Sequence, residues 1–160
     1  MATITEADKR FIQMACELAS DNIDKGGGPF GAVIVKDGEV VATGCNLVTV
    51  INDPTAHAEI NAIREACRKR ESFKLDDCVI YSSCEPCPMC MSAIYWAGIS
   101  KVYYANTKLD AAAIDFDDNF IYEEMGKRYE YRSIPFIHVA NKSAIDHFEK
   151  WASKTDKIEY

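Results

Sequence analysis

Two short stretches of the sequence hold side chains that together could bind a soft divalent metal ion. His57 lies in TAHAEINAIREAC, and Cys87 and Cys90 follow about 30 residues later in SCEPCPMCMSA. Pro86 suits the first turn of a helix, so both cysteines are expected at a helix N-terminus, where their spacing puts the sulfurs on one face. The positive end of the helix favours thiolate, the form that binds metal. One imidazole and two thiolates leave one tetrahedral position open, as in catalytic zinc sites.

Glu59 is placed to move protons beside such a metal. It follows His57 by two residues, so we expect it close to the metal without being needed as a ligand. Water in the open position would lose a proton near neutral pH. The carboxylate could take that proton and pass it to a leaving group, which is general acid–base catalysis at hydrogen-bond range. The two stretches therefore indicate a hydrolytic reaction.

A third cysteine near the pair allows a different interpretation. Cys84, Cys87 and Cys90 form a C-x-x-C-x-x-C run, which could indicate a three-cysteine metal site or an iron–sulfur cluster. Because Cys84 precedes Glu85 and Pro86, we place it at a strand end, outside the helix, as a neighbour of the metal and not a ligand. The chain has seven cysteines and no secretion signal at its N-terminus, which argues against a disulfide framework.

Length, composition and charge limit the classes of protein to which the chain could belong. The 160 residues fit one domain, 1–160, and 48% of them are hydrophobic, with no apolar run long enough to span a membrane. We therefore expect a cytoplasmic protein. The net charge of -7 makes nucleic acid a poor partner. The dense basic cluster, Arg64 to Arg70, more simply fits a solvated helix end.

The elements that must position these residues alternate between strands and helices. A capped helix should run from near Thr5 to Lys25, and Asp37-Gly38 should turn a hairpin. A helix should begin near Thr55 and another near Pro86. Further strands are expected in DCVIYSS, KVYYA and PFIHVA, with a short helix near 120–125 and a last helix at 143–155. This order predicts a three-layer α/β/α domain around a mixed five-stranded sheet.

The motifs resemble those of a known family. H-A-E and P-C-P-M-C match the H-x-E…P-C-x-x-C signature of zinc-dependent nucleobase deaminases. The stretch from about residue 29 to 105 resembles the cytidine deaminase superfamily fold, and the small bacterial-type guanine deaminases are similar nearly end to end. The segments that carry the resemblance are GGPFGAVIVKDG, NDPTAHAEINAIREAC, SCEPCPMCMSAIYWA, FDDNFIYEE and the final Tyr160. The first three also occur, with variation, in adenosine and other base deaminases.

The resemblance implies an activity and a set of site residues. The implied enzyme is a hydrolase of C–N bonds in cyclic amidines. It converts guanine and water to xanthine and ammonia in purine catabolism or salvage, with one Zn²⁺ per chain. Glu59 would be catalytic, and Asp118 would contact the exocyclic amine and assist proton transfer. The implied base contacts are a hydrogen bond from Asn46, packing by Phe30 and a backbone N–H from Ala58. A C-terminal helix and tail, 143–160, would bring Tyr160 over the pocket, in a homodimer that could exchange these segments.

The sequence leaves other assignments open. A deaminase of guanosine or of another base or nucleoside would use the same three metal-binding residues. A tRNA adenosine deaminase is disfavoured by the acidic charge, and a zinc-binding scaffold with a dead site is disfavoured by the presence of Glu59. Phe30 could equally be a core residue, and Asn46 could stabilise a turn only.

Overall fold

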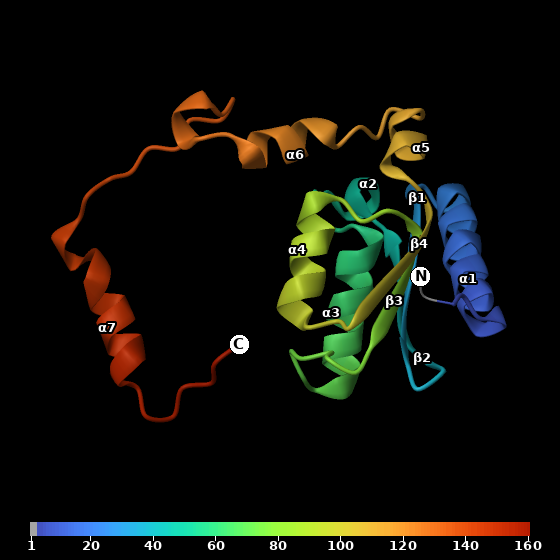
Figure 1. The fold of residues 1–160 in the computed structure, drawn as a ribbon, viewed down its shortest axis with the longest axis horizontal. Helices are drawn as coiled ribbons and strands as arrows, with labels where there is room; N and C mark the ends of the chain where they lie inside the picture. Colours follow the sequence, from blue (N-terminus) through green and yellow to red (C-terminus); the bar gives the residue numbers. More distant parts are fainter. Residues whose placement is uncertain (1–2) are drawn as a thin grey trace. The chain divides into compact units, whose positions relative to one another are not determined.

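The computed structural model describes residues 3–160, which divide into two compact units, residues 3–120 and Ile121–Tyr160. The first unit contains a mixed sheet in the order β2-β1-β3-β4 (Figure 1). Strand β1 pairs antiparallel with both β2 and β3, and β3 pairs parallel with β4. The strands are β1 Gly28–Lys36, β2 Glu39–Asn46, β3 Val79–Cys84 and β4 Lys101–Asn106.

The predicted hairpin between β1 and β2 is confirmed. Its two turn residues, Asp37 and Gly38, both have positive φ, at 50° and 81°. A two-residue turn of this kind matches the right-handed twist of the flanking strands. The turn brings Asn46, the last residue of β2, back beside Gly28 at the start of β1.

Helix α1, Glu6–Asp24, covers one face of the sheet, and its N-terminus carries the predicted cap (Figure 1). The Thr5 side chain accepts a hydrogen bond from the Asp8 N–H, and the Asp8 carboxylate accepts one from the Thr5 N–H. Asp8 Oδ1 also accepts a hydrogen bond of 2.6 Å from the Tyr81 hydroxyl on β3. Buried side chains join α1 to this face, among them Phe11, Ala15, Val33, Val35 and Tyr81.

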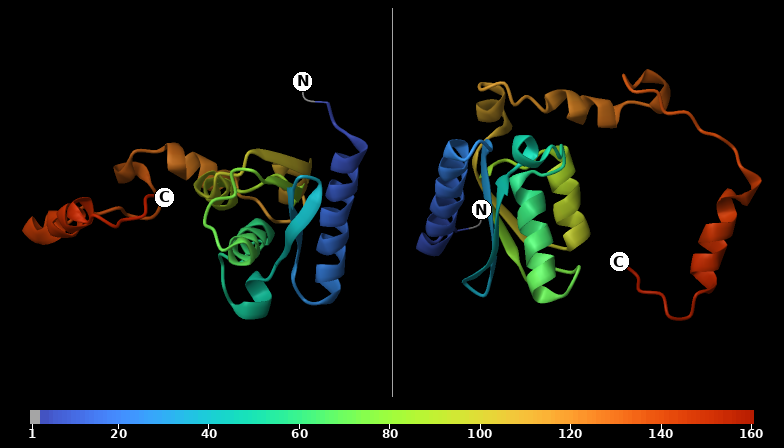
Figure 2. Two further views of the ribbon diagram at one scale, coloured as in Figure 1. Left: turned by 90° about the horizontal axis from the view of Figure 1, so that it is seen from below. Right: turned by 180° about the vertical axis from the view of Figure 1, so that it is seen from behind.

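Helices α3, Ala58–Arg70, and α4, Pro88–Ala97, cover the opposite face, so the first unit has the predicted α/β/α layers (Figure 2). The core between them contains Ile34, Leu75, Ile80 and the alanines of α3. A Cβ atom on Gly44 of β2 would collide with the backbone of Ala58 and Ala62. The absence of a side chain there lets α3 approach the sheet closely.

The prediction of five strands is wrong: the sheet has four. Residues 135–140, PFIHVA, form no strand, although their alternating pattern predicts one. A strand gains its stability from backbone hydrogen bonds to a neighbour, and within residues 3–160 no strand pairs with this segment. Its side chains are instead exposed, Ile137 at 81% and Val139 at 78%.

Shorter helices complete the chain. Two were not predicted, α2 Val48–Ile51 and α5 Lys108–Ala112, and α5 begins with a second capping box, formed by Thr107 and Asp110. Helix α6, Asn119–Gly126, agrees with the predicted short helix. The predicted last helix begins later and ends earlier, as α7 Asp146–Ser153, preceded by a 3₁₀ turn at Lys142–Ile145. Another 3₁₀ turn spans Tyr129–Tyr131. No described helix is both long and apolar enough for a membrane span.

Candidate metal centre and active site

Two helix starts bring the predicted metal ligands together. His57 is the N-cap residue of α3, and Cys87 is the N-cap residue of α4, with Pro88 at its first turn. The His57 Nδ1 atom lies 3.5 Å from Cys87 Sγ and 3.6 Å from Cys90 Sγ. The three ligand atoms all lie within 4.8 Å of one another, close enough to share one ion. These three residues, His57, Cys87 and Cys90, are called the metal group below.

The pKa values of the two thiols in this group are shifted in opposite directions. A hydrogen bond from Cys90, with a further one from His57, lowers the pKa of Cys87 to about 4 against the opposing effect of burial. The same sharing of a proton, together with burial, raises the pKa of Cys90. The hydrogen bond to Cys87 raises the pKa of His57 against desolvation. Two thiolates this close repel each other, so both ionise together when a cation lies between them.

The chemistry of the donor set fits Zn²⁺. Imidazole nitrogen and thiolate sulfur are the ligands that zinc prefers, and structural zinc sites normally have four such protein ligands. Here three residues form the group, and among the residues described it is the one His/Cys/acid cluster with a metal-binding arrangement. A three-ligand group keeps a coordination position for a reactant.

Cys84 lies outside this group. Its thiol donates a hydrogen bond of 3.6 Å to the Thr107 carbonyl oxygen. Burial, with the nearby charge of Glu59, raises the pKa of Cys84 to about 11, so it remains a thiol at neutral pH. The structure therefore does not bring the three cysteines of the C-x-x-C-x-x-C run onto one ion.

The Glu59 carboxyl lies beside the metal group and is 6% exposed. Burial raises its pKa, which suits a group that must both accept and return a proton near neutral pH. One carboxylate oxygen, Oε2, accepts a hydrogen bond of 3.4 Å from Cys90 Sγ. The other, Oε1, accepts one of 3.2 Å from the Ser82 hydroxyl on β3. Sequence reasoning missed Ser82, although a hydroxyl at an inward position of a buried strand is a signal that could have found it.

Asn46 lies at the end of β2 and is 6% exposed. Its Oδ1 atom accepts a hydrogen bond of 3.2 Å from the Val48 N–H. The Asn22 side chain, also missed from sequence, donates to the carbonyl oxygens of Gly28 and Asn46, at 2.8 and 2.7 Å. Asn22 therefore ties the end of α1 to both strands where the predicted base contacts lie.

Phe30 and Ala58 lie in the first unit on β1 and α3. The Phe30 ring packs partly into the core and meets Phe116 edge to face, with ring centroids 5.0 Å apart. Ala58 is the first residue of α3 and is fully buried. A backbone N–H in the first turn of a helix has no partner within the helix, so it can serve a bound group.

Of the two remaining candidates, Asp118 lies within electrostatic range of the metal group. The pKa of His57 is raised mainly by its hydrogen bond with Cys87, and the negative charge of Asp118 adds to that rise. Burial together with the charge of Cys87 raises the pKa of Asp118 itself. Asp117 instead accepts a hydrogen bond from the Asn119 N–H. Tyr160 belongs to the second unit and is 76% exposed, so its predicted role rests on the sequence alone.

Comparison with known proteins adds three findings. Residues 5–106 match the family described as the cytidine and deoxycytidylate deaminase zinc-binding region. The guanine deaminase of Bacillus subtilis (strain 168) is 52% identical over 152 residues, which are 95% of this chain and 96% of that protein. The X-ray structure of guanine deaminase from Bacillus subtilis has a TM-score of 0.94 at 49% identity, and the match covers 98% of this chain and 99% of that one.

A tRNA-specific adenosine deaminase is also similar, over a shorter stretch. The protein from Aquifex aeolicus (strain VF5) is 42% identical over 95 residues, which are 59% of this chain and 63% of that protein. The likeness to guanine deaminase thus runs nearly end to end, and the likeness to the tRNA enzyme does not.

Proposed function

The chain belongs to the cytidine and deoxycytidylate deaminase family, and on that basis we propose that it is a zinc-dependent hydrolase that converts guanine and water to xanthine and ammonia. The observation that carries the reaction class is the buried carboxyl of Glu59 beside a group of one imidazole and two thiols. A proton carrier and three metal ligands on two adjacent helix starts are the parts that hydrolytic deamination needs.

His57, Cys87 and Cys90 are the proposed zinc ligands. A bound Zn²⁺ lowers the pKa of a coordinated water toward neutral, which provides a nucleophile at physiological pH. The lowered pKa of Cys87 keeps one thiolate ready to bind the ion. Cys87 also lies at the positive end of α4, which further favours anionic sulfur.

Glu59 is the proposed proton carrier. It accepts a proton from the attacking water and gives it to a ring nitrogen of the base. It then takes the remaining proton from the newly added hydroxyl group and delivers it to the departing amine. The net reaction forms a C–O bond and breaks the C–N bond to the exocyclic amino group, so ammonia leaves. Burial raises its pKa, which suits a carboxyl that must take up and return a proton.

The side chains that we propose as base contacts suit a flat, polar ring. Phe30 and Phe116 form an edge-to-face pair that can pack on one face of a purine. We propose that Asn46 and the Ala58 N–H bind polar atoms on the edge of the ring and that Asp118 faces the exocyclic amine. Sites that pair several polar groups with a substrate reject analogues strongly, because a mismatch leaves buried groups unpaired.

The choice of guanine is supported by the near full-length likeness to a guanine deaminase. The acidic net charge of -7 also disfavours a tRNA substrate, whose phosphates it would repel. The test is ammonia release from guanine, guanosine, adenine, cytosine and cytidine, measured side by side with protein of known zinc content. Guanine should be the preferred substrate. If another compound of this panel is deaminated and guanine is not, the substrate assignment is wrong, although the proposed reaction class remains supported.

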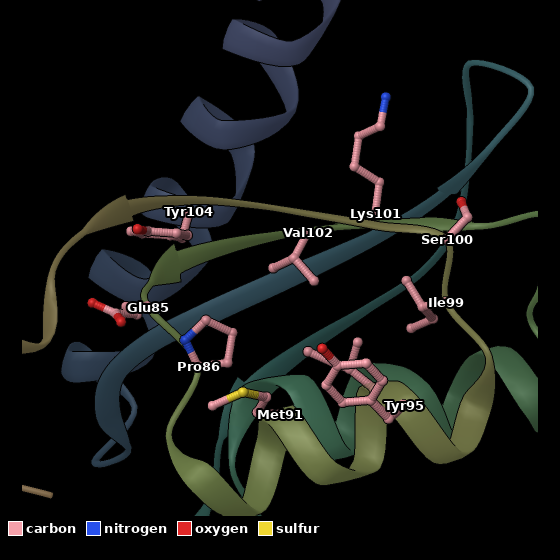
Figure 3. A pocket seen from close by; sticks show the side chains of 10 residues that line it. Glu85, Pro86, Met91, Tyr95, Ile99, Ser100, Lys101, Val102 and Tyr104 are labelled. Atoms are coloured by element: carbon pink, nitrogen blue, oxygen red, sulfur yellow. The ribbon is translucent and has the colours of Figure 1, made fainter. Parts of the chain in front are cut away.

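We further propose that the chain acts as a homodimer that covers the outer edge of β4. A pocket of about 330 Å³ lies between α4 and β4 and includes none of the metal group (Figure 3). Met91 and Tyr95 of α4 face Val102 and Tyr104 of β4 across it, and Tyr95 is 79% exposed. Strand β4 is an edge strand with one side unpaired in the described sheet, and such edges are normally covered.

The occupant we propose is the segment 135–140 of a second copy, added as a fifth strand, with the 143–160 segment closing the site. The alternating apolar side chains of this segment and its lack of strand partners within residues 3–160 support this arrangement. Light scattering on the purified protein should give the mass of two chains. Tyr95→Lys should shift it toward monomer, whereas Val50→Lys, at another exposed apolar position, should not. A monomeric parent protein would contradict the proposal.

A further inference from the structure

Ser82 is a polar residue in an apolar layer. Side chains alternate along a strand, so Ser82 points to the same side of β3 as Ile80, into the core under α3 and α4. Tyr81, its neighbour, packs on the opposite face against α1. Ser82 is only 2% exposed. A hydroxyl buried at this depth costs free energy unless a hydrogen bond compensates for the lost water.

The partner of that hydroxyl is Glu59. Ser82 Oγ donates to Glu59 Oε1 at 3.2 Å, and both side chains are buried. The other carboxylate oxygen takes its side-chain hydrogen bond from Cys90. A thiolate donates no hydrogen bond, so Cys90 cannot hold the carboxylate while it binds a metal ion. Ser82 is then the side-chain donor to Glu59 that remains among the described contacts.

We propose that Ser82 is a positioning residue whose hydroxyl fixes the orientation of the Glu59 carboxylate for proton transfer, an inference that rests on the proposed function. Glutamate has three rotatable side-chain bonds, and its terminal torsion is loosely restrained. Proton transfer depends strongly on the placement of the donor and acceptor atoms. A hydroxyl fixed on a central strand restrains that torsion, because the strand is paired on both sides, to β1 and to β4.

The kinetic test compares Ser82→Ala with two other variants of the full-length, zinc-loaded protein. Ser82→Ala should keep its zinc and its KM for guanine, while kcat falls about tenfold or more, the loss expected when a hydrogen bond to a charged group is removed. Ser82→Thr keeps the hydroxyl and should recover most of kcat. The matched control is Ser83→Ala, which removes the adjacent hydroxyl. Ser83 is 3% exposed and bonds to the Gly31 N–H, so its loss should lower stability with little change in kcat.

A crystallographic comparison tests the same proposal without turnover. In zinc-loaded crystals, the Glu59 carboxylate should have one orientation in the parent protein and a different or mixed orientation in Ser82→Ala. An unchanged, fully ordered carboxylate in Ser82→Ala would overturn the proposal, as would a kcat loss no larger than that of Ser83→Ala. If the parent protein leaves guanine unchanged, the proposed function fails, and the crystals still decide whether Ser82 positions Glu59.

Discussion

At the residue scale, the proposed tasks of Glu59 and of the proposed metal ligands differ, so substitutions should separate them. Glu59→Gln keeps the size of the side chain and removes its ability to carry a proton. We expect the variant to fold and to hold zinc, and kcat to fall by about 10²–10⁴-fold, the usual contribution of general acid–base catalysis. Turnover assays and metal analysis of the same sample measure both. A Glu59→Gln protein that retains near-parental kcat would remove Glu59 from its role.

Substitutions of the cysteines should distinguish a proposed metal ligand, Cys87, from the neighbouring Cys84. Cys87→Ser should lose zinc, because a hydroxyl is a much weaker zinc ligand than a thiolate. Cys84→Ser should keep zinc, since Cys84 is bonded to the Thr107 carbonyl and lies outside the metal group. Measuring the zinc content of the two purified variants tests both expectations. Zinc loss from Cys84→Ser would restore the three-cysteine interpretation.

The sequence predicted that the three proposed metal ligands lie together, and it did not predict their supporting contacts. His57, Cys87 and Cys90 come together because each lies at or near a helix start that local sequence determines, and Glu59 follows from its spacing to His57. Ser82 and Asn22 act through contacts with residues 23 and 24 positions away. Such contacts depend on how the elements pack, which single-residue patterns do not specify.

At the scale of the element, the closeness of α3 to β2 positions both His57 and Glu59. Gly44→Ala would place a methyl group against the backbone of α3. We expect the free energy of unfolding to fall by about 1–3 kcal/mol, the usual cost of overpacking, and zinc content and kcat to fall with it. Urea unfolding measures the stability. Gly126→Ala, where an added Cβ meets nothing within 4 Å, is the control, and equal losses in the two variants would contradict this account.

The attachment of α1 to β3 should depend on pH. The hydrogen bond from Tyr81 is the main reason that the pKa of Asp8 lies below its ordinary value of 3.8. A lowered carboxyl pKa stabilises the fold above the unfolded-state pKa, and that stability is lost as pH falls through the folded-state value. Tyr81→Phe should therefore lower the free energy of unfolding by about 1–3 kcal/mol near neutral pH, and the deficit should shrink in acid.

Urea unfolding at several pH values measures this deficit. Tyr103→Phe is the matched control, because it changes the ring stacked on Tyr81 and leaves the hydrogen bond to Asp8 in place. A Tyr81→Phe deficit that stays constant down to pH values well below 3.8 would show that Asp8 is not the group involved.

Elements with strong local signals were predicted correctly, and those that need a distant partner were not. The hairpin at Asp37-Gly38 and the cap at Thr5 are encoded within a few residues. Residues 135–140 have the alternation of a strand, but alternation does not supply the neighbour that a strand must pair with. The short helices α2 and α5 have too few residues for a periodic pattern, although the Thr107–Asp110 capping box was a readable signal for α5.

At the scale of the whole molecule, the acidic net charge is consistent with the proposed small, uncharged substrate. An excess of seven negative charges suits a free base better than a polyanion. The family match covers residues 5–106, which include the three proposed zinc ligands and Glu59. The likeness to guanine deaminase extends past residue 106 to nearly the full chain. We therefore expect some of the residues that determine substrate specificity to lie after residue 106.

The most direct test of this account is the yield of xanthine and ammonia from guanine as zinc is returned to metal-stripped protein. The stripped protein should be inactive, and turnover should rise in proportion to zinc until about one ion is bound per chain. Xanthine and ammonia should appear in equal amounts. Full activity in the stripped protein, or no activity with one zinc bound per chain, would contradict the central claim.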